Sequence, residues 1–308
     1  MILPRLGLAL AVAVLAGSAA QAQSWPGQPP TSPEVEAALS QMRAGQSSGL
    51  RDLQRLADAG RPDAQFYLGP LYLFGAGGLA KDGVKGCAYE MKASATRADA
   101  MHLVAECYQH GYGGEKNDEK AMAAFQRASD MGLVKSKCAL GNMLMASGRD
   151  EKRGAALCRE AAEGGDADAQ TDLGNLYLNS KILPHDSVEA RRWYEKAAAQ
   201  NQANAAVVLG QIYWNGDGVT KDNAAAARYW RVAFDHGRED AAKFLGDEAF
   251  VRASRPDKSW TVAGLDEARG WYEKAVEARN PDIRAEAIER AKLMQQLKDV
   301  MMRQGRGS

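Results

Sequence analysis

A pattern that recurs about every 36 residues constrains this chain more than any other feature. In each copy a large residue is followed directly by a small one, and successive copies are 36, 36, 33, 36 and 36 residues apart. The pairs are Leu68-Gly69, Val104-Ala105, Leu140-Gly141, Leu173-Gly174, Leu209-Gly210 and Leu245-Gly246. A period of this length is typical of helical hairpins stacked in a row.

A second motif follows each pair and marks the second helix of every hairpin. It reads small-x-x-large-x-x-x-Ala, as in Ala190-Trp193-Ala197, Ala226-Tyr229-Ala233 and Ala268-Trp271-Ala275. Small side chains let paired helices approach closely, and we expect the large aromatics to fill the gap between one hairpin and the next. One hairpin cannot bury its own apolar stripe, so stability comes from stacking. The sequence therefore predicts an all-α fold, an α-solenoid of about six helix-turn-helix repeats with capping helices.

The N-terminus has the features of an export signal. Arg5 precedes an apolar run, Leu6 to Ala16, that is too short to span a bilayer. Ala20-Gln21-Ala22 then fits signal peptidase cleavage before Gln23. We therefore expect a periplasmic or secreted protein without membrane insertion after cleavage, the alternative being an uncleaved anchor. A lipid anchor is disfavoured because Ser18 stands where a lipoprotein has cysteine.

Five segments follow from these boundaries. We predict a signal peptide over 1–22, a flexible Pro- and Gly-rich linker over 23–33 and an N-terminal capping half-repeat over 34–60. Six repeats occupy 61–280, and a capping helix follows over 281–303. Residues 304–308 are expected to be disordered.

The four cysteines form two pairs with the same spacing. Cys87 and Cys107 are 20 residues apart, as are Cys138 and Cys158, and the midpoint of each pair falls in a predicted turn between antiparallel helices. Two residues equidistant from such a turn lie at the same height, where a disulfide can form. An exported protein meets oxidising conditions. We predict the disulfides Cys87–Cys107 and Cys138–Cys158, the alternative being four buried thiols.

The fifth unit resembles the repeat of the Sel-one-like repeat (SLR) family, which is related to the tetratricopeptide repeat. The matching residues are Ala205, Leu209, Gly210, Tyr213, Gly216, Gly218, Val219, Asp222, Ala226, Trp230 and Ala233. The resemblance covers roughly residues 61–280, although the third unit lacks the G-x-G turn and the first carries Pro70 in its first helix. It implies a right-handed superhelix whose concave face is lined by first helices. It also implies an adaptor that holds protein partners and needs no cofactor.

The residues offer little support for catalysis, a metal site or nucleic-acid binding. The chain has 39 basic and 39 acidic residues, so it lacks a basic footprint for nucleic acid. It contains no S-x-x-K, G-x-S-x-G or P-loop motif. Its four histidines do not form a three- or four-ligand set. We therefore expect no enzyme and no cofactor, and the alternative interpretation is a cell-envelope enzyme or a glycan- or peptidoglycan-binding protein.

Partner binding is expected at residues outside the repeated core set, at the ends of the first helices. The candidates are Phe74, His110, Asn179, Trp214 and Asn215. Trp214 is the most informative, because a tryptophan beside a turn can anchor a partner. Its alternative role is packing against the neighbouring hairpin. The resulting hypothesis is a scaffold for a protein or peptide, bound on the concave face, in an envelope signalling or assembly system.

Overall fold

The computed structural model describes residues 30–254 and 260–303 of the protein. Within these ranges the chain forms fifteen α-helices and no β-strand, and Ser254 and Trp260 form an isolated antiparallel bridge. The predicted signal peptide and most of the predicted linker lie outside the described residues. So do residues 304–308 and most of the insertion before Trp260.

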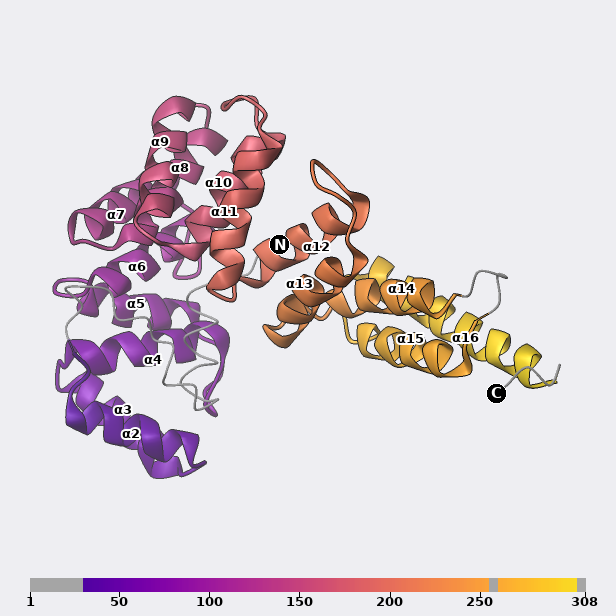
Figure 1. Cartoon of the computed structure of the whole chain (residues 1–308). Helices are drawn as coiled ribbons and strands as arrows, with labels where there is room; N and C mark the ends of the chain where they lie inside the picture. The colour runs from indigo at the N-terminus through magenta and orange to yellow at the C-terminus, as the bar shows by residue number, and fades with distance from the viewer. Residues whose placement is uncertain (1–29, 255–259, 304–308) are drawn as a thin grey trace. The chain divides into compact units, whose positions relative to one another are not determined.

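The helices alternate between two series, which are the first and second helices of each repeat (Figure 1). The first helices are α4 (Pro62–Phe74), α6 (Ala98–His110), α8 (Val134–Ala146), α10 (Ala167–Asn179), α12 (Ala203–Asn215) and α14 (Ala241–Ala253). The second helices are α5 (Gly83–Ala93), α7 (Asp118–Asp130), α9 (Glu151–Glu163), α11 (Ser187–Ala199), α13 (Asn223–Asp235) and α15 (Val262–Ala275). The N-terminal capping segment is itself a helix pair, α2 (Pro33–Arg43) and α3 (Ser47–Asp58), and α16 (Pro281–Arg303) follows the last repeat.

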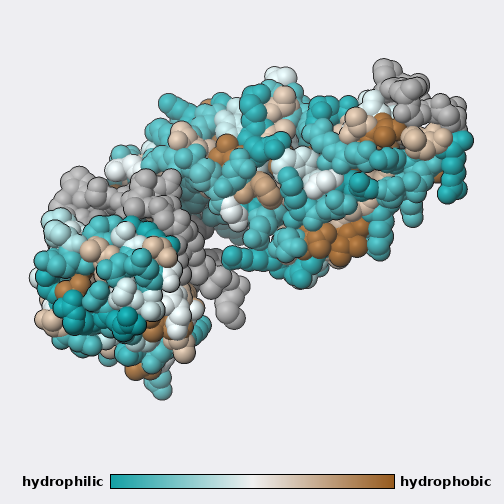
Figure 2. Space-filling model, turned by 90° about the horizontal axis from the view of Figure 1, so that it is seen from below, coloured by the Kyte–Doolittle hydropathy of each residue, from teal (hydrophilic) through white to brown (hydrophobic). Residues whose placement is uncertain are grey.

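The chain divides into two compact units, and the boundary falls in α9 after Ala161. Unit one contains the helices before that point, and unit two contains α10 to α16. Each unit has its own apolar interior, built from the repeated Leu, Ala and aromatic residues. The face shown in Figure 2 is accordingly mostly hydrophilic, with hydrophobic side chains in separate patches.

A glycine of the first helix receives an aromatic ring of the second helix in three hairpins of unit two. A Cβ atom added at Gly174 would lie 2.7 Å from the Tyr194 ring, and one at Gly246 would lie 2.7 Å from the Tyr272 ring. A Cβ at Gly210 would overlap the Trp230 indole nitrogen, which donates to the Val207 carbonyl at 3.3 Å. Glycine is therefore required for the close approach, although it is a poor helix former.

This contact corrects the expected role of the large residue in the second motif. The motif places Trp193 and Tyr229 between hairpins, but both are half-buried. The following residues, Tyr194 and Trp230, are the buried ones, and each lies against the first helix of its own hairpin. Trp230 also stacks on Phe244 of the next hairpin, with ring centroids 5.3 Å apart. Trp271 does meet the preceding hairpin, with its ring 5.4 Å from that of Phe234.

The hairpin turns owe their shape to a glycine at the start and an acidic or amide residue at the end. Gly75, Gly111 and Gly216 end α4, α6 and α12 in the left-handed conformation, with φ of 68°, 70° and 82°. Asp82, Asn117, Asp186 and Asp222 then cap the second helices, each accepting a backbone N–H with its side chain. The turns thus hold the ends of neighbouring helices in fixed positions.

Candidate functional site

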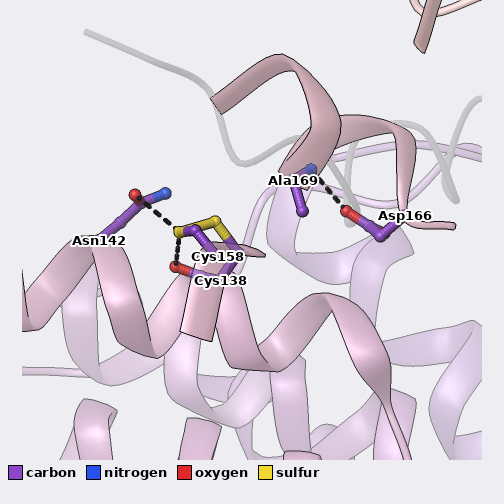
Figure 3. Close-up of a disulfide and its surroundings, with 5 residues drawn as sticks. All are labelled: Cys138, Asn142, Cys158, Asp166 and Ala169. Carbon is purple, nitrogen blue, oxygen red and sulfur yellow. Dashed lines mark hydrogen bonds between the residues drawn. A yellow bond between two sulfur atoms is a disulfide. The ribbon is translucent and has the colours of Figure 1, made fainter. Parts of the chain in front are cut away.

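The structure joins Cys87 to Cys107 and Cys138 to Cys158. The first disulfide links α5 to α6, the second helix of one hairpin to the first helix of the next, with Cα atoms 6.0 Å apart. The second lies within one hairpin, between α8 and α9, with Cα atoms 4.0 Å apart (Figure 3). There Gly141 and Gly154 bring the two backbones together, because a Cβ at either one would overlap the carbonyl oxygen of the other. Both disulfides lie in unit one.

Phe74 and His110, two of the predicted partner-binding residues, lie near the Cys87–Cys107 disulfide. Phe74 and Tyr112 pack against Cys87, Cys107 and Leu73, and the His110 ring is 5.2 Å from that of Tyr112. Phe74 is half-buried, whereas His110 is exposed. Phe74 therefore covers the disulfide, and His110 is the member of this pair that solvent reaches.

Asn179 lines an open pocket in unit two, which we call the α10–α12 groove. Its walls are Leu178 and Asn179 at the end of α10, His185 and Ser187 at the start of the next helix, Ile212 of α12, and Asp217 and Gly218 in the turn after α12. The pocket has a volume of about 420 Å³. Asn215 adjoins it, since its side-chain amide donates to Asp217 at 3.1 Å. Two predicted residues are thus brought to one place.

Trp214 packs against an aromatic ring and a lysine of its own hairpin. It is half-buried, and its ring centroid lies 5.6 Å from that of Trp230 in its own hairpin. The Lys221 ammonium group, on the other side of the turn, lies 5.1 Å from the Trp214 ring centroid. Trp214 therefore packs within the fifth hairpin, and partner binding by its exposed part stays a prediction.

Asp217 is a groove residue that the sequence does not single out, although it stands in the G-x-G turn that carries the family resemblance. Among the described residues, no lysine, arginine or histidine nitrogen makes a salt bridge with its carboxylate. The G-x-G motif gives no reason to single out Asp217, because the two flanking glycines account for the shape of the turn. Its acidic side chain, at the variable position between Gly216 and Gly218 and two residues after Asn215, is the signal that could have found it.

Unit one also contains a buried polar network in which a serine, a histidine and a carboxylate follow one another, as in a catalytic triad. Ser136 Oγ is 2.8 Å from His102 Nδ1, and His102 Nε2 is 3.7 Å from Glu106 Oε1. Ser136 is 0% exposed and His102 is buried with its ring edge-on to Phe125. A substrate cannot reach the hydroxyl, so the network satisfies polar groups between α6 and α8. Within the described ranges, no three His, Cys, Asp or Glu residues are arranged to hold a metal ion.

The repeats match the family model of the Sel1 repeat at residues 62–89, 98–133, 135–166, 167–202, 203–237 and 265–280. These segments make up more than half of the chain. The protein belongs to the Sel1 repeat family. The recognition of the SLR pattern and the all-α solenoid fold are thereby confirmed. Sel1 repeats are protein-interaction scaffold domains.

Two solved structures place the Sel1 repeat protein among relatives of the same fold. A Sel1 repeat protein from Oxalobacter formigenes is 25% identical, with a TM-score of 0.63, over 78% of this chain and 98% of that one. A protective antigen present in uropathogenic Escherichia coli strains, displaying an SLR fold, is 20% identical with a TM-score of 0.53. That match covers 87% of this chain and 60% of the antigen, so it shows the fold alone. The comparison with curated proteins gives no match.

Proposed function

We propose that this Sel1 repeat protein is an exported scaffold that binds a protein or peptide partner at the turn ends of its first helices. The observation that carries the proposal is that buried and exposed positions of the repeat have different roles. Repeated residues such as Leu209, Trp230 and Ala233 are 0–1% exposed, so they hold the hairpins together. The last position of the first helix is different, because its residue type varies between units, and the exposed residues Asn179 and Asn215 that occupy it in α10 and α12 lie at or beside the α10–α12 groove.

Export to the periplasm or the exterior is part of the proposal. It is supported by the signal-like segment before Gln23 and by the pairing of all four cysteines in two disulfides. Disulfides persist in oxidising compartments and are rare in the cytosol of most organisms. No helix within 30–254 and 260–303 is long and apolar enough to cross a membrane. An envelope signalling or assembly system is the setting that we propose for the partner.

A pull-down from the envelope fraction tests the scaffold function. The mature protein, beginning at Gln23, is immobilised beside the variant Asn179→Ala and a control in which Asp235, exposed at the end of α13, becomes Asn. We expect a defined polypeptide on the wild type and the control, and less of it on the Asn179 variant. Retention or hydrolysis of peptidoglycan fragments, with no polypeptide captured, would instead support the glycan-directed alternative.

A further inference from the structure

The α10–α12 groove lies where two first helices end. α10 ends at Asn179 and α12 ends at Asn215, and both run in the same sense as members of one series. The C-terminal end of a helix carries a partial negative charge from its carbonyl groups. Turn residues take some of these carbonyls, as the Asp186 and Asp222 amides do at Tyr177 and Tyr213. The two helix dipoles nevertheless point their negative ends towards the turns that line the groove.

A full negative charge stands in the same place. Asp217 lines the groove, and its side chain accepts a hydrogen bond from the neutral amide of Asn215. Lys221, the lysine of the same turn, lies over the Trp214 ring instead. Within the described part of the chain, the Asp217 carboxylate therefore has no cationic partner within 4.0 Å. A carboxylate in this setting is an unused acceptor for a charged donor.

His185 adds a further acceptor to the groove wall. Its Nδ1 atom is 3.0 Å from the Leu178 carbonyl oxygen, and because a carbonyl can only accept, Nδ1 must carry the hydrogen. In the neutral ring Nε2 is then an acceptor. Asn179 and Ser187 offer an amide oxygen and a hydroxyl that can also accept. The polar part of the groove thus suits a donor-rich group.

Apolar side chains complete the groove. Leu178 and Ile212 contribute aliphatic surface, and Ile212 is buried. The volume of about 420 Å³ is within the range of sites that enclose small ligands. Lysine and arginine combine an aliphatic stem with a charged group that donates several hydrogen bonds. An acidic side chain would be repelled by the negative charge of Asp217. A wholly apolar side chain would leave that charge without a partner.

We infer that the α10–α12 groove accepts a basic side chain, lysine or arginine, of a polypeptide partner, with Asp217 recognising its charge. The inference rests on the proposed scaffold function and specifies the chemistry of the partner. Asn215 acts as a positioning residue, because its amide holds the Asp217 carboxylate at 3.1 Å.

Nuclear magnetic resonance titration of the mature protein tests this inference with defined probes. The probes are the Nα-acetyl, N-methylamide derivatives of lysine, arginine and norleucine, the last having the stem without the charge. We expect saturable shifts of the Asn179, Ser187 and Gly218 amides with lysine or arginine, and none with norleucine. Asp217→Asn should weaken binding roughly fivefold, as expected for one exposed charge pair. Asp235→Asn, which changes an exposed aspartate of α13 outside the groove, should bind like the wild type.

Two outcomes would overturn the inference: equal binding of the norleucine probe, or equal binding of the basic probes to wild type and Asp217→Asn. Absence of saturable shifts with every probe would overturn it as well. Its failure is distinguishable from that of the scaffold function. If the pull-down recovers the same polypeptide on wild type and Asp217→Asn, the scaffold stands and the role of Asp217 is wrong. If no polypeptide is recovered although the lysine probe binds, the scaffold function fails.

Discussion

The Glu90 carboxyl group lies against Gly69, at the place where Tyr194 lies against Gly174 in the fourth hairpin. A Cβ atom at Gly69 would overlap Glu90 Oε1, so a larger residue there would force the Glu90 side chain to move. Glu90 is 0% exposed, and neither of its carboxyl oxygens has a hydrogen-bond partner among the described residues. A buried carboxyl group without partners costs stability, and far more when it is ionised. The first hairpin therefore contains a destabilising group at the place where the fourth, fifth and sixth hairpins have an aromatic ring.

Unfolding of unit one should depend on the protonation of Glu90. Burial raises the pKa of Glu90 well above its usual 4.5, Asp99 and Glu106 raise it further, and Arg97 opposes them. Because the pKa is raised in the folded state, the native protein binds the proton more tightly than the unfolded chain. The contribution of Glu90 to the free energy of unfolding should thus be most favourable below pH 4.5. It should fall as the pH rises towards the pKa of Glu90 in the folded state.

Urea unfolding at a series of pH values, followed by circular dichroism, measures this dependence. Glu90→Gln removes the titrating group, so the difference in stability between variant and wild type should grow in favour of the variant as the pH rises. Tryptophan fluorescence in a Trp25→Phe background is an internal control, because the other five tryptophans, Trp193, Trp214, Trp230, Trp260 and Trp271, all lie in unit two. Parallel pH profiles for the two proteins would show that Glu90 does not titrate in this range.

A methyl group should be tolerated at one helical glycine and rejected at another. Gly210→Ala places a Cβ into the Trp230 indole, and overpacking of this kind costs about 1–3 kcal/mol. Gly270 lies inside α15, and a Cβ atom there would meet no described residue within 4 Å. Gly270→Ala should therefore stabilise the protein by about 0.5–1 kcal/mol. Fluorescence-detected urea unfolding reports both changes. Equal effects of the two substitutions would contradict the packing of Trp230 on Gly210.

The disulfides should stabilise unit one and leave unit two unchanged. Each closes a loop of similar length, and such a bond contributes about 3 kcal/mol. Reduction should therefore lower the stability seen by circular dichroism without moving the tryptophan transition. Non-reducing peptide mapping of the exported protein should recover the linked peptides of Cys87 with Cys107 and of Cys138 with Cys158. Alkylation of all four cysteines in the native protein would exclude both bonds.

The helices and their order can be predicted because every repeat must bury the same positions. Leu209 and Gly210 recur for this physical reason, so their spacing alone indicates the hairpins. The motif cannot choose between Trp193 and Tyr194 as the buried ring, because adjacent residues differ by about 100° around a helix and both can serve an apolar face. The glycine on the facing helix decides it, and that contact appears when both helices are placed.

The groove is harder to predict than the fold. Asn179 and Asp217 are far apart in the sequence, and the stacking of two hairpins brings their turns to one pocket. Asn179 and Asn215 lie at helix ends outside the buried core set, and the packing residues Phe74 and Trp214 meet the same criterion. The position of a residue along the helix places it near the turn, whereas its exposure depends on rings that pack across the turn.

Site-specific photocrosslinking in living cells tests the central claim, that the turn ends of the first helices hold a polypeptide partner, most directly. A photoreactive phenylalanine analogue replaces Asn179 in the groove, and in a parallel strain it replaces Asp235, which is exposed at the end of α13. After irradiation, the account predicts a discrete adduct from position 179 that mass spectrometry identifies as a polypeptide, and no such adduct from position 235. The absence of a polypeptide adduct from position 179, or the same adduct from both positions, would contradict it.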